Sequence, residues 1–184
     1  MIIIGITGTL GAGKGTIVDY LVEKMGFKHF SVRQFLIEEI EKQGLPVNRD
    51  SMTSVANKLR ASHSPSYIIE QLFKKAVDNG GNAIIESIRT PGEVDFLKKQ
   101  GKFYLIAVDA DRSIRYQRIT IRASETDKIS FDIFQANEKR EFTTSDPNKQ
   151  NLSRCIQLAD IVLQNNGSLD ELHKQLEEKL IEIV

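Results

Sequence analysis

Cysteine, tryptophan, proline and long apolar runs are all scarce in this sequence. The 184 residues include one cysteine, four prolines and no tryptophan. A single cysteine, Cys155, excludes an internal disulfide and is typical of proteins kept in a reducing cytoplasm. No apolar run approaches the ~20 residues that a membrane-spanning helix needs. We therefore expect a cytoplasmic protein with no membrane partner, in which Cys155 is a small buried thiol.

Neither sign of charge is in excess. Lysines and arginines number 25, aspartates and glutamates also number 25, and the isoelectric point is near 6.8. Nucleic-acid-binding proteins usually carry a basic excess, so we expect no nucleic-acid partner. A chain of this length can bury a full core without disulfides or a structural metal. We expect one domain over residues 1–184, as a monomer or a small homo-oligomer.

Short apolar runs alternate with helical patterns along the chain. We expect strands at residues 2–6, 27–31, 82–86, 103–108 and 159–163. The spacing predicts helices at 17–25, 34–43, 50–60, 65–78 and 91–100, one capped by Asp109 or Asp111, two within 124–150, and a last one over 169–183. Strands that are apolar throughout predict a parallel sheet with helices on both faces. Such sheets bind ligands beyond the carboxyl ends of their strands.

The most informative segment is 8–16, Gly-Thr-Leu-Gly-Ala-Gly-Lys-Gly-Thr, directly after the first apolar run. Its glycines allow a tight turn in which successive amide N–H groups point at one anion, and the helix that follows adds its positive N-terminus. Lys14 can reach the β- and γ-phosphates of a nucleoside triphosphate. The residues expected to bind ATP are Gly8, Thr9, Leu10, Gly11, Ala12, Gly13, Lys14, Gly15 and Thr16. The alternative is a flexible glycine turn without a ligand.

Oxygen-bearing side chains near this loop indicate a magnesium site. The phosphate-loop pattern places Ser or Thr directly after the lysine, whereas here Gly15 stands there and the hydroxyl comes at Thr16. Glu86 ends a predicted strand and could hold Mg²⁺ through water, because hard cations prefer oxygen ligands. We expect Mg²⁺ to bind with ATP at Thr16 and Glu86. The alternative for Glu86 is a solvated strand end.

Basic residues elsewhere are candidates for binding a second substrate. Arg89 follows the third predicted strand, so it should lie on the same rim as the loop, although it could be a surface arginine near a helix cap. Arg33 and Arg60, with His63, are further candidates, and each could equally be ordinary surface. Arg140 lies in a segment of balanced charge, for which a solvated helix is as reasonable as a site.

Three more arginines share one helical face. Arg115, Arg118 and Arg122 are spaced three and four residues apart, and three guanidiniums so placed repel unless an anion lies among them. We therefore expect them to surround an anion. The alternative is a solvated face paired with Asp109, Asp111 or Glu125.

Together these segments resemble the nucleoside monophosphate kinases, adenylate kinase among them. Segment 8–16 looks like their phosphate loop, which also has glycine before the threonine. Segment 30–36, Phe-Ser-Val-Arg-Gln-Phe-Leu, resembles their acceptor-binding segment, and 85–89, Ile-Glu-Ser-Ile-Arg, resembles the element whose arginine holds the acceptor phosphate. Segment 118–122, Arg-Ile-Thr-Ile-Arg, is similar to the arginine pair that begins the lid. Segment 159–168 looks more like the end of dephospho-coenzyme A kinases and related archaeal kinases.

Several positions depart from that family's pattern. Gln34 and Ile37 stand where the acceptor segment usually has an acidic residue and an arginine. Glu86 and Ser87 replace Asp-Gly. The lid segment has no cysteine, so no zinc site is expected there.

The resemblance implies an α/β protein with the three-layer α/β/α P-loop kinase fold, a five-stranded parallel sheet and a short helical lid. It implies an acceptor-binding helical segment at about 32–79 and a lid at about 118–146. The expected catalytic residues are Lys14, Arg89, Arg118 and Arg122, with Arg118 also contacting ATP. The expected acceptor-binding residues are Ser31, Arg33, Arg60 and Arg89.

The sequence therefore predicts an ATP-dependent phosphotransferase that acts on a small phosphorylated acceptor. A nucleoside or deoxynucleoside monophosphate is the first candidate acceptor. Such a transfer needs in-line positioning and charge neutralisation more than covalent participation of the protein. Three alternatives remain open: a dephospho-coenzyme A kinase, an ATPase or nucleotide-dependent switch without a small acceptor, and a nucleotide-binding scaffold without catalysis.

Overall fold

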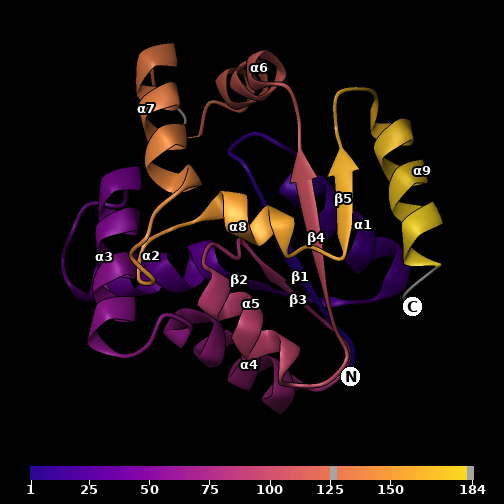
Figure 1. Cartoon of the computed structure of the whole chain (residues 1–184), viewed down its shortest axis with the longest axis horizontal. Coiled ribbons are helices and arrows are strands. Elements are labelled where there is room, and N and C mark those ends of the chain that lie inside the picture. The colour runs from indigo at the N-terminus through magenta and orange to yellow at the C-terminus, as the bar shows by residue number, and fades with distance from the viewer. Residues whose placement is uncertain (125–127, 182–184) are drawn as a thin grey trace.

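A computed structural model of the chain describes residues 1–124 and 128–181. Its centre is a parallel sheet whose strands are ordered β2-β3-β1-β4-β5 (Figure 1). The strands are β1 (Ile3–Gly8), β2 (Lys28–Ser31), β3 (Ala83–Glu86), β4 (Phe103–Asp109) and β5 (Ile161–Gln164). All five predicted strands are confirmed, with ends within a few residues of those expected.

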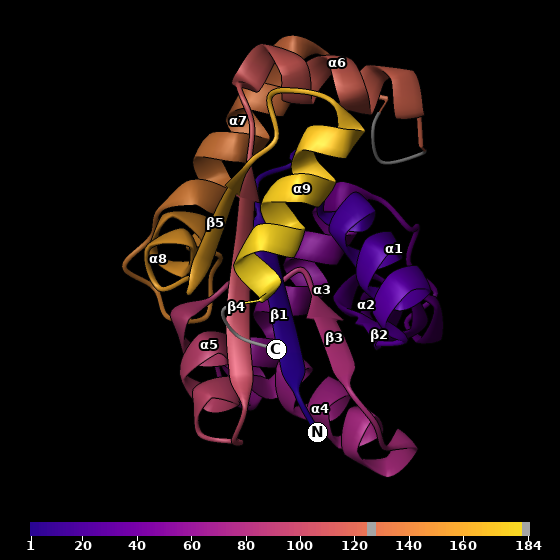
Figure 2. The same cartoon turned by 90° about the vertical axis from the view of Figure 1, so that its right-hand side faces the viewer.

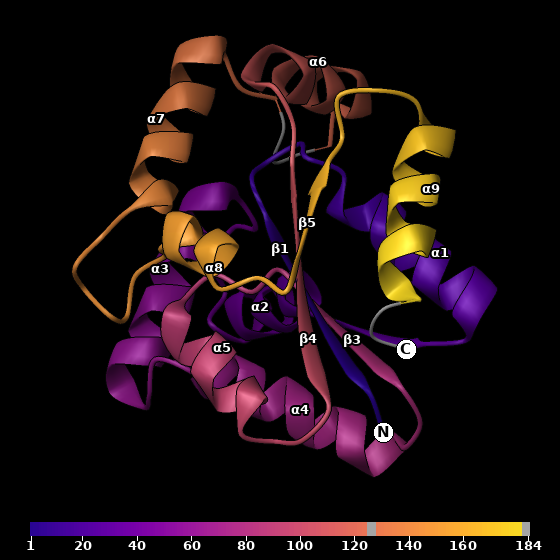
Figure 3. The same cartoon turned by 45° about the vertical axis from the view of Figure 1, so that its right-hand side comes forward.

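Helices cover both faces of the sheet, as the apolar strands predicted. On one face, α1 (Lys14–Met25) and α9 (Leu169–Leu180) pack on Ile4 and Ile6 of β1 (Figures 2 and 3). The other face carries α2 (Val32–Lys42), α3 (Arg49–Ser62), α4 (Tyr67–Asn79), α5 (Pro91–Lys98) and α8 (Leu152–Gln157). Ile3 belongs to this second cluster, because successive strand residues point to opposite faces. β1 therefore lies in a sheet with a buried apolar cluster on each side.

Two further helices lie beyond the carboxyl ends of the strands, α6 (Arg112–Arg122) and α7 (Phe131–Phe142) (Figures 1 and 3). Two helices were expected within residues 124–150, but α7 is the only one in the described part of that stretch. The next helix, α8, begins after it at Leu152. Among the described residues no helix combines the length and the apolar character that a membrane crossing requires.

Side-chain caps explain most helix starts, although Asp111, at the expected N-cap position of α6, makes no capping hydrogen bond. Thr90 and Glu93 form a capping box at the start of α5, which has proline at its first position. The helix expected at 50–60 begins one residue earlier, at Arg49, because Asn48 caps it and Ser51 completes its capping box. Asparagine is among the residues preferred at an N-cap, so Asn48 is a local sequence signal for this helix start.

The last helix and the cysteine agree with expectation in most respects. The last helix was expected over 169–183; α9 spans Leu169–Leu180 with Leu172, Leu176 and Leu180 buried, and residues 182–184 lie outside the described part. Cys155 is fully buried on α8, and its burial raises the pKa of the thiol to about 12. The predicted buried thiol is confirmed.

Candidate active site

The phosphate loop joins the carboxyl end of β1 to the N-terminus of α1. Gly8 and Gly13 have φ angles of 145° and 106°, which favour glycine. A Cβ atom on Gly8 would lie 2.1 Å from the carbonyl oxygen of Val108, and one on Gly13 would lie 2.3 Å from Nδ2 of Asn165. Glycine is therefore required at both positions by conformation and by close approach. At Gly15 a Cβ would meet nothing within 4 Å, so steric crowding does not explain glycine there.

Lys14 is folded back onto the loop that carries it. Its Nζ donates to the carbonyl oxygens of Gly8 and Thr9, both at 2.9 Å. Burial, followed by the positive charge of Arg89, lowers the pKa of Lys14 to about 7. The loop carbonyls accept hydrogen bonds from Lys14 but carry no net charge, whereas a bound phosphate is negatively charged and would stabilise the protonated ammonium. Lys14 is thus poised to gain charge when an anion enters the loop.

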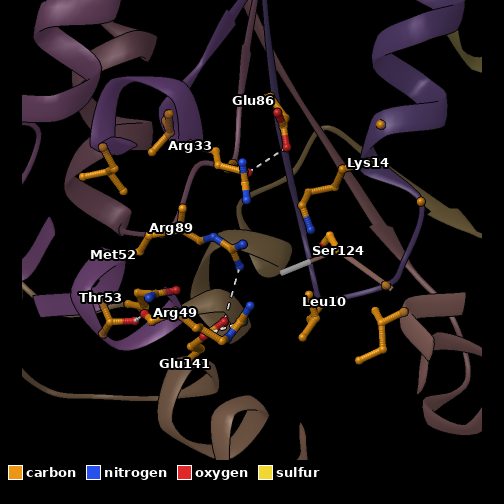
Figure 4. Close-up of a pocket in the computed structure, with 18 of the residues that line it drawn as sticks. Leu10, Lys14, Arg33, Arg49, Met52, Thr53, Glu86, Arg89, Ser124 and Glu141 are labelled. Atoms are coloured by element: carbon orange, nitrogen blue, oxygen red, sulfur yellow. Dashed lines mark hydrogen bonds and ion pairs between the residues drawn. The ribbon is translucent and has the colours of Figure 1, made fainter. Parts of the chain in front are cut away.

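A cavity of about 620 Å³ opens in front of the loop and collects most of the predicted site residues (Figure 4). Its wall includes the predicted residues Leu10, Gly11, Gly13, Lys14, Gly15, Thr16, Arg33, Arg60, Glu86, Arg89, Arg118 and Arg122. Seven basic and three acidic side chains line it, an excess of four positive charges in a chain with no net charge. The cavity is therefore suited to a polyanion.

Not every predicted residue contributes a side chain to this cavity. Ser31 is absent from its lining, and its hydroxyl caps α2 by accepting from the amide of Gln34 at 3.2 Å. Gly8, Thr9 and Ala12 belong to the loop but do not line the cavity. Thr9 instead donates its hydroxyl hydrogen to Asp109 at 2.5 Å, which ties the loop to the end of β4.

Glu86 lies at the end of β3 and lines the cavity beside Lys14 in the view of Figure 4. Its carboxylate accepts from Ser87 at 2.8 Å and lies 3.3 Å from Nε2 of His29. Burial raises the pKa of Glu86, but the hydrogen bond from His29 and the charge of Lys14 outweigh it and lower the pKa to about 2. Glu86 is therefore an ionised carboxylate. Ser87 has a φ of 70°, a left-handed conformation that favours glycine.

Thr16 and Glu86, the two residues expected to hold Mg²⁺, both line the cavity and offer oxygen donors. Within residues 1–124 and 128–181 no three His, Cys, Asp or Glu side chains gather into a metal-binding group. Mg²⁺ usually keeps several waters and binds through one or two protein oxygens together with substrate phosphates. A hydroxyl and an ionised carboxylate beside a phosphate loop fit that mode of binding.

Arg60 lies at the cavity but is largely committed to another partner. Its Nε and NH2 atoms donate to Oε1 of Glu93 at 3.0 and 2.9 Å, and both side chains are buried. Oε2 of Glu93 accepts from the backbone amides of Arg89 and Thr90 at 2.7 and 3.0 Å. Arg60 was expected to be either an acceptor-binding or a surface residue. It is buried, and through Glu93 it supports the backbone at Arg89.

The three arginines of α6 do not act as one group. Arg118 and Arg122 line the cavity, but Arg115 is buried behind the loop. Arg115 donates to the carbonyl oxygens of Ala110 and Leu10 and pairs with Glu138, and it lies 3.5 Å from Asp109. The expectation that all three surround one anion is therefore wrong for Arg115, whose charge is met by protein carboxylates. Glu125, the other carboxylate considered, lies outside the described residues.

Sequence reasoning missed three residues that complete the site. Arg49 donates to Oε1 of Glu141 at 2.6 Å, and Oε2 of Glu141 lies 3.7 Å from Arg89 (Figure 4). Asn165, after β5, donates to the carbonyl oxygen of Ala12 at 2.8 Å. Its Oδ1 accepts from Arg118 at 3.3 Å, so it links the phosphate loop to the arginine of α6.

Two other candidates lie away from the cavity. Arg140 contacts Asp50 at 3.2 Å on an exposed part of α7, which agrees with the solvated-helix interpretation. The ring of His63 stacks on Tyr67 with centroids 4.0 Å apart. Neither residue lines the cavity.

Comparison with known proteins identifies the family. A family model described as AAA domain matches residues 4–144, more than half of the chain. A UPF0200 protein of Methanococcus maripaludis is 30% identical over 187 aligned positions, which cover 100% of this chain and 98% of the relative. The chain belongs to the UPF0200 family and carries this AAA domain.

Solved structures share the fold of this UPF0200 protein. TT1252 from Thermus thermophilus superposes with a TM-score of 0.62 at 20% identity, covering 100% of this chain and 98% of the other. A gluconokinase from Sinorhizobium meliloti superposes with a TM-score of 0.61 at 13% identity, covering 98% and 92%. The UPF0200 protein thus has the predicted P-loop kinase fold, with three α/β/α layers around a five-stranded parallel sheet.

Proposed function

We propose that this UPF0200 protein transfers the γ-phosphoryl group of ATP to a small phosphorylated acceptor. The observation that carries the proposal is the convergence of Lys14, Arg89, Arg118 and Arg122 on one cavity at the carboxyl ends of the strands. These residues come from three separate parts of the sequence, because Arg118 and Arg122 share α6. The likeness in fold to a gluconokinase supports the reaction class.

Each side chain has a role in this proposal. The loop amides and Lys14 bind the β- and γ-phosphates, and Arg118 and Arg122 neutralise charge on the transferring group. Arg89 binds the acceptor phosphate. Thr16 and Glu86 would hold Mg²⁺, which when bound bridges the ATP phosphates and neutralises part of their charge. The helices at the mouth of the cavity exclude water that would otherwise hydrolyse ATP.

The acceptor is tested by a screen for ADP formation. Purified protein with Mg-ATP is offered ribo- and deoxynucleoside monophosphates and dephospho-coenzyme A, and ADP is measured by a coupled assay. The proposal requires at least one acceptor that raises ADP formation well above the rate without acceptor. Among the candidates, a nucleoside monophosphate is expected to be the better acceptor.

One contact favours a second candidate, an ATPase without a small acceptor. Glu141 already pairs with Arg49 and lies 3.7 Å from Arg89, so a protein carboxylate meets part of the charge that an acceptor phosphate would meet. ADP formation that no acceptor in the screen stimulates would favour this second function.

Arg89→Ala is expected to raise the KM for the acceptor about 10- to 100-fold, because a charged hydrogen bond to its phosphate is lost. The KM for ATP should change far less. Steady-state kinetics with the acceptor found in the screen measures both constants. Arg140→Ala, an arginine outside the cavity, is the matched control. An unchanged acceptor KM in Arg89→Ala would contradict the assigned role.

ATP binding is expected to take up a proton at pH 8. With its pKa near 7, Lys14 is about nine-tenths neutral at that pH, and a bound phosphate restores its charge. Uptake should fall towards zero below about pH 6, where Lys14 is already charged. Calorimetric titrations in two buffers of different ionisation enthalpy measure the number of protons. Lys14→Arg stays protonated and should show no uptake at pH 8, so equal uptake in both proteins would refute the prediction.

A further inference from the structure

Buried polar atoms without hydrogen-bond partners gather at the cavity. Among the described residues these atoms are Nε of Arg49, Oδ1 of Asn57, NH1 of Arg60, NH1 of Arg118 and Oε1 of Gln150. Four of the five belong to residues that line the cavity. A buried polar atom left unpaired costs about 1–3 kcal/mol, so such atoms at one cavity point to a ligand that pairs with them.

Three of these atoms lie on the acceptor side, around Arg89. The backbone amide of Asn151 donates to the carbonyl oxygen of Arg89 at 2.8 Å, which holds the neighbouring Gln150 beside it. The Asn151 side chain donates to the carbonyl oxygen of Thr144 at 2.9 Å and holds the rest of this segment. Figure 4 shows Arg49 and Glu141 beyond Arg89 as seen from Lys14. Arg89 joins this group to the loop that would hold ATP, since its NH1 atom donates to the carbonyl oxygen of Gly8 at 3.5 Å.

The hydrogen-bonding chemistry of these atoms is specific. Nε of Arg49 and NH1 of Arg60 are donors, and with the guanidinium of Arg89 they suit an anion. Oε1 of Gln150 is an acceptor, so its partner must be a hydroxyl, an amine or a ring N–H. A second anionic group has no hydrogen to donate, so it could not pair with Oε1 of Gln150.

The same side of the cavity has an apolar wall. Val32 and Leu36 of α2 and Met52 and Ala56 of α3 line it, and all four belong to or pack on the apolar cluster of that face. Inorganic phosphate cannot cover such a wall, whereas an organic body can.

We infer that this half of the cavity binds an organic anion with an apolar body and a hydrogen-bond donor, and that Gln150 selects the donor. The inference rests on the proposed function, because it names the class of acceptor. The anionic group binds Arg49, Arg60 and Arg89, the body packs on α2 and α3, and the donor pairs with Oε1 of Gln150. A nucleoside monophosphate with a base N–H belongs to this class.

Binding without ATP or Mg²⁺ tests this inference separately from catalysis. Calorimetry with the wild-type protein uses the four common ribonucleoside 5′-monophosphates, dephospho-coenzyme A and inorganic phosphate. At least one organic ligand should bind more than about tenfold more tightly than phosphate. Gln150→Met should weaken that ligand about 10- to 100-fold and leave phosphate binding unchanged.

Gln157→Met is the matched control, because Gln157 is exposed on α8 and does not line the cavity. Its binding should equal that of the wild type. Urea unfolding checks the fold of Gln150→Met, and Gln150→Ala serves as a second variant with a shorter side chain. Organic ligands that bind no more tightly than phosphate, or a folded Gln150 variant that binds like the wild type, would overturn the inference. Because no phosphoryl transfer is measured, either outcome leaves the proposed reaction to its own test.

Discussion

Replacing Lys14 with methionine is expected to lower the rate of ADP formation about 100- to 1,000-fold. Methionine keeps a similar length but removes the charge that neutralises the β- and γ-phosphates. The rest of the loop stays, since the glycine conformations and the bond between Thr9 and Asp109 do not depend on Lys14. The coupled ADP assay with the acceptor from the screen measures the loss.

Lys24→Met is the control for this prediction, because Lys24 is exposed at the far end of the same helix. It should keep wild-type activity. Urea unfolding of Lys14→Met should show a folded protein. The substitution removes only the two hydrogen bonds from Lys14 to the carbonyl oxygens of Gly8 and Thr9, and it leaves the apolar core unchanged. A folded Lys14→Met with activity within tenfold of the wild type would remove the basis of the proposed function.

Glu93→Ala is expected to destabilise the protein by about 3–5 kcal/mol, because it leaves the buried guanidinium of Arg60 without its counter-charge. It also leaves the amides of Arg89 and Thr90 without an acceptor. The free energy of unfolding from urea titration measures the effect. Since Glu93 holds the backbone at Arg89, the activity of the remaining folded protein should also fall.

Glu171 provides a control with the same local chemistry and no buried partner. It completes the capping box of α9 in an exposed position, where its carboxylate accepts from the amide of Ser168 at 2.7 Å. Glu171→Ala should therefore cost only about 0.5–2 kcal/mol. The pair Arg60→Met with Glu93→Met should recover much of the lost stability. Equal losses for Glu93→Ala and Glu171→Ala would show that the buried ion pair is not the cause.

The phosphate loop and the strands could be predicted because their signals are local. Short apolar runs mark β1, β3, β4 and β5, and the glycine spacing of segment 8–16 needs no distant partner. The place of Arg89 also followed from local information, because a residue just after a parallel strand lies at the ligand-binding edge. These predictions depend on neighbours in the chain.

The partners of the arginines could not be predicted in this way. Arg49 and Glu141 are 92 residues apart in sequence, and Arg60 and Glu93 are 33 apart. Helical spacing put Arg115 on the face of Arg118, but Glu138 on another helix pairs with Arg115 behind the loop. Spacing describes one helix, whereas the packing of α7 against α6 decides which charge each guanidinium meets.

From its order of residues alone, this chain specified a phosphate-binding turn between a buried strand and a helix, since backbone conformation and dipole direction follow from local residue types. The tertiary structure determined which side chains reach that turn and which form ion pairs with other residues of the protein. The acceptor side, with Arg49, Glu141 and Gln150, exists only because α3, α7 and the segment before α8 meet there. Electrostatic pairing acts through space, and distances between remote residues are a property of packing.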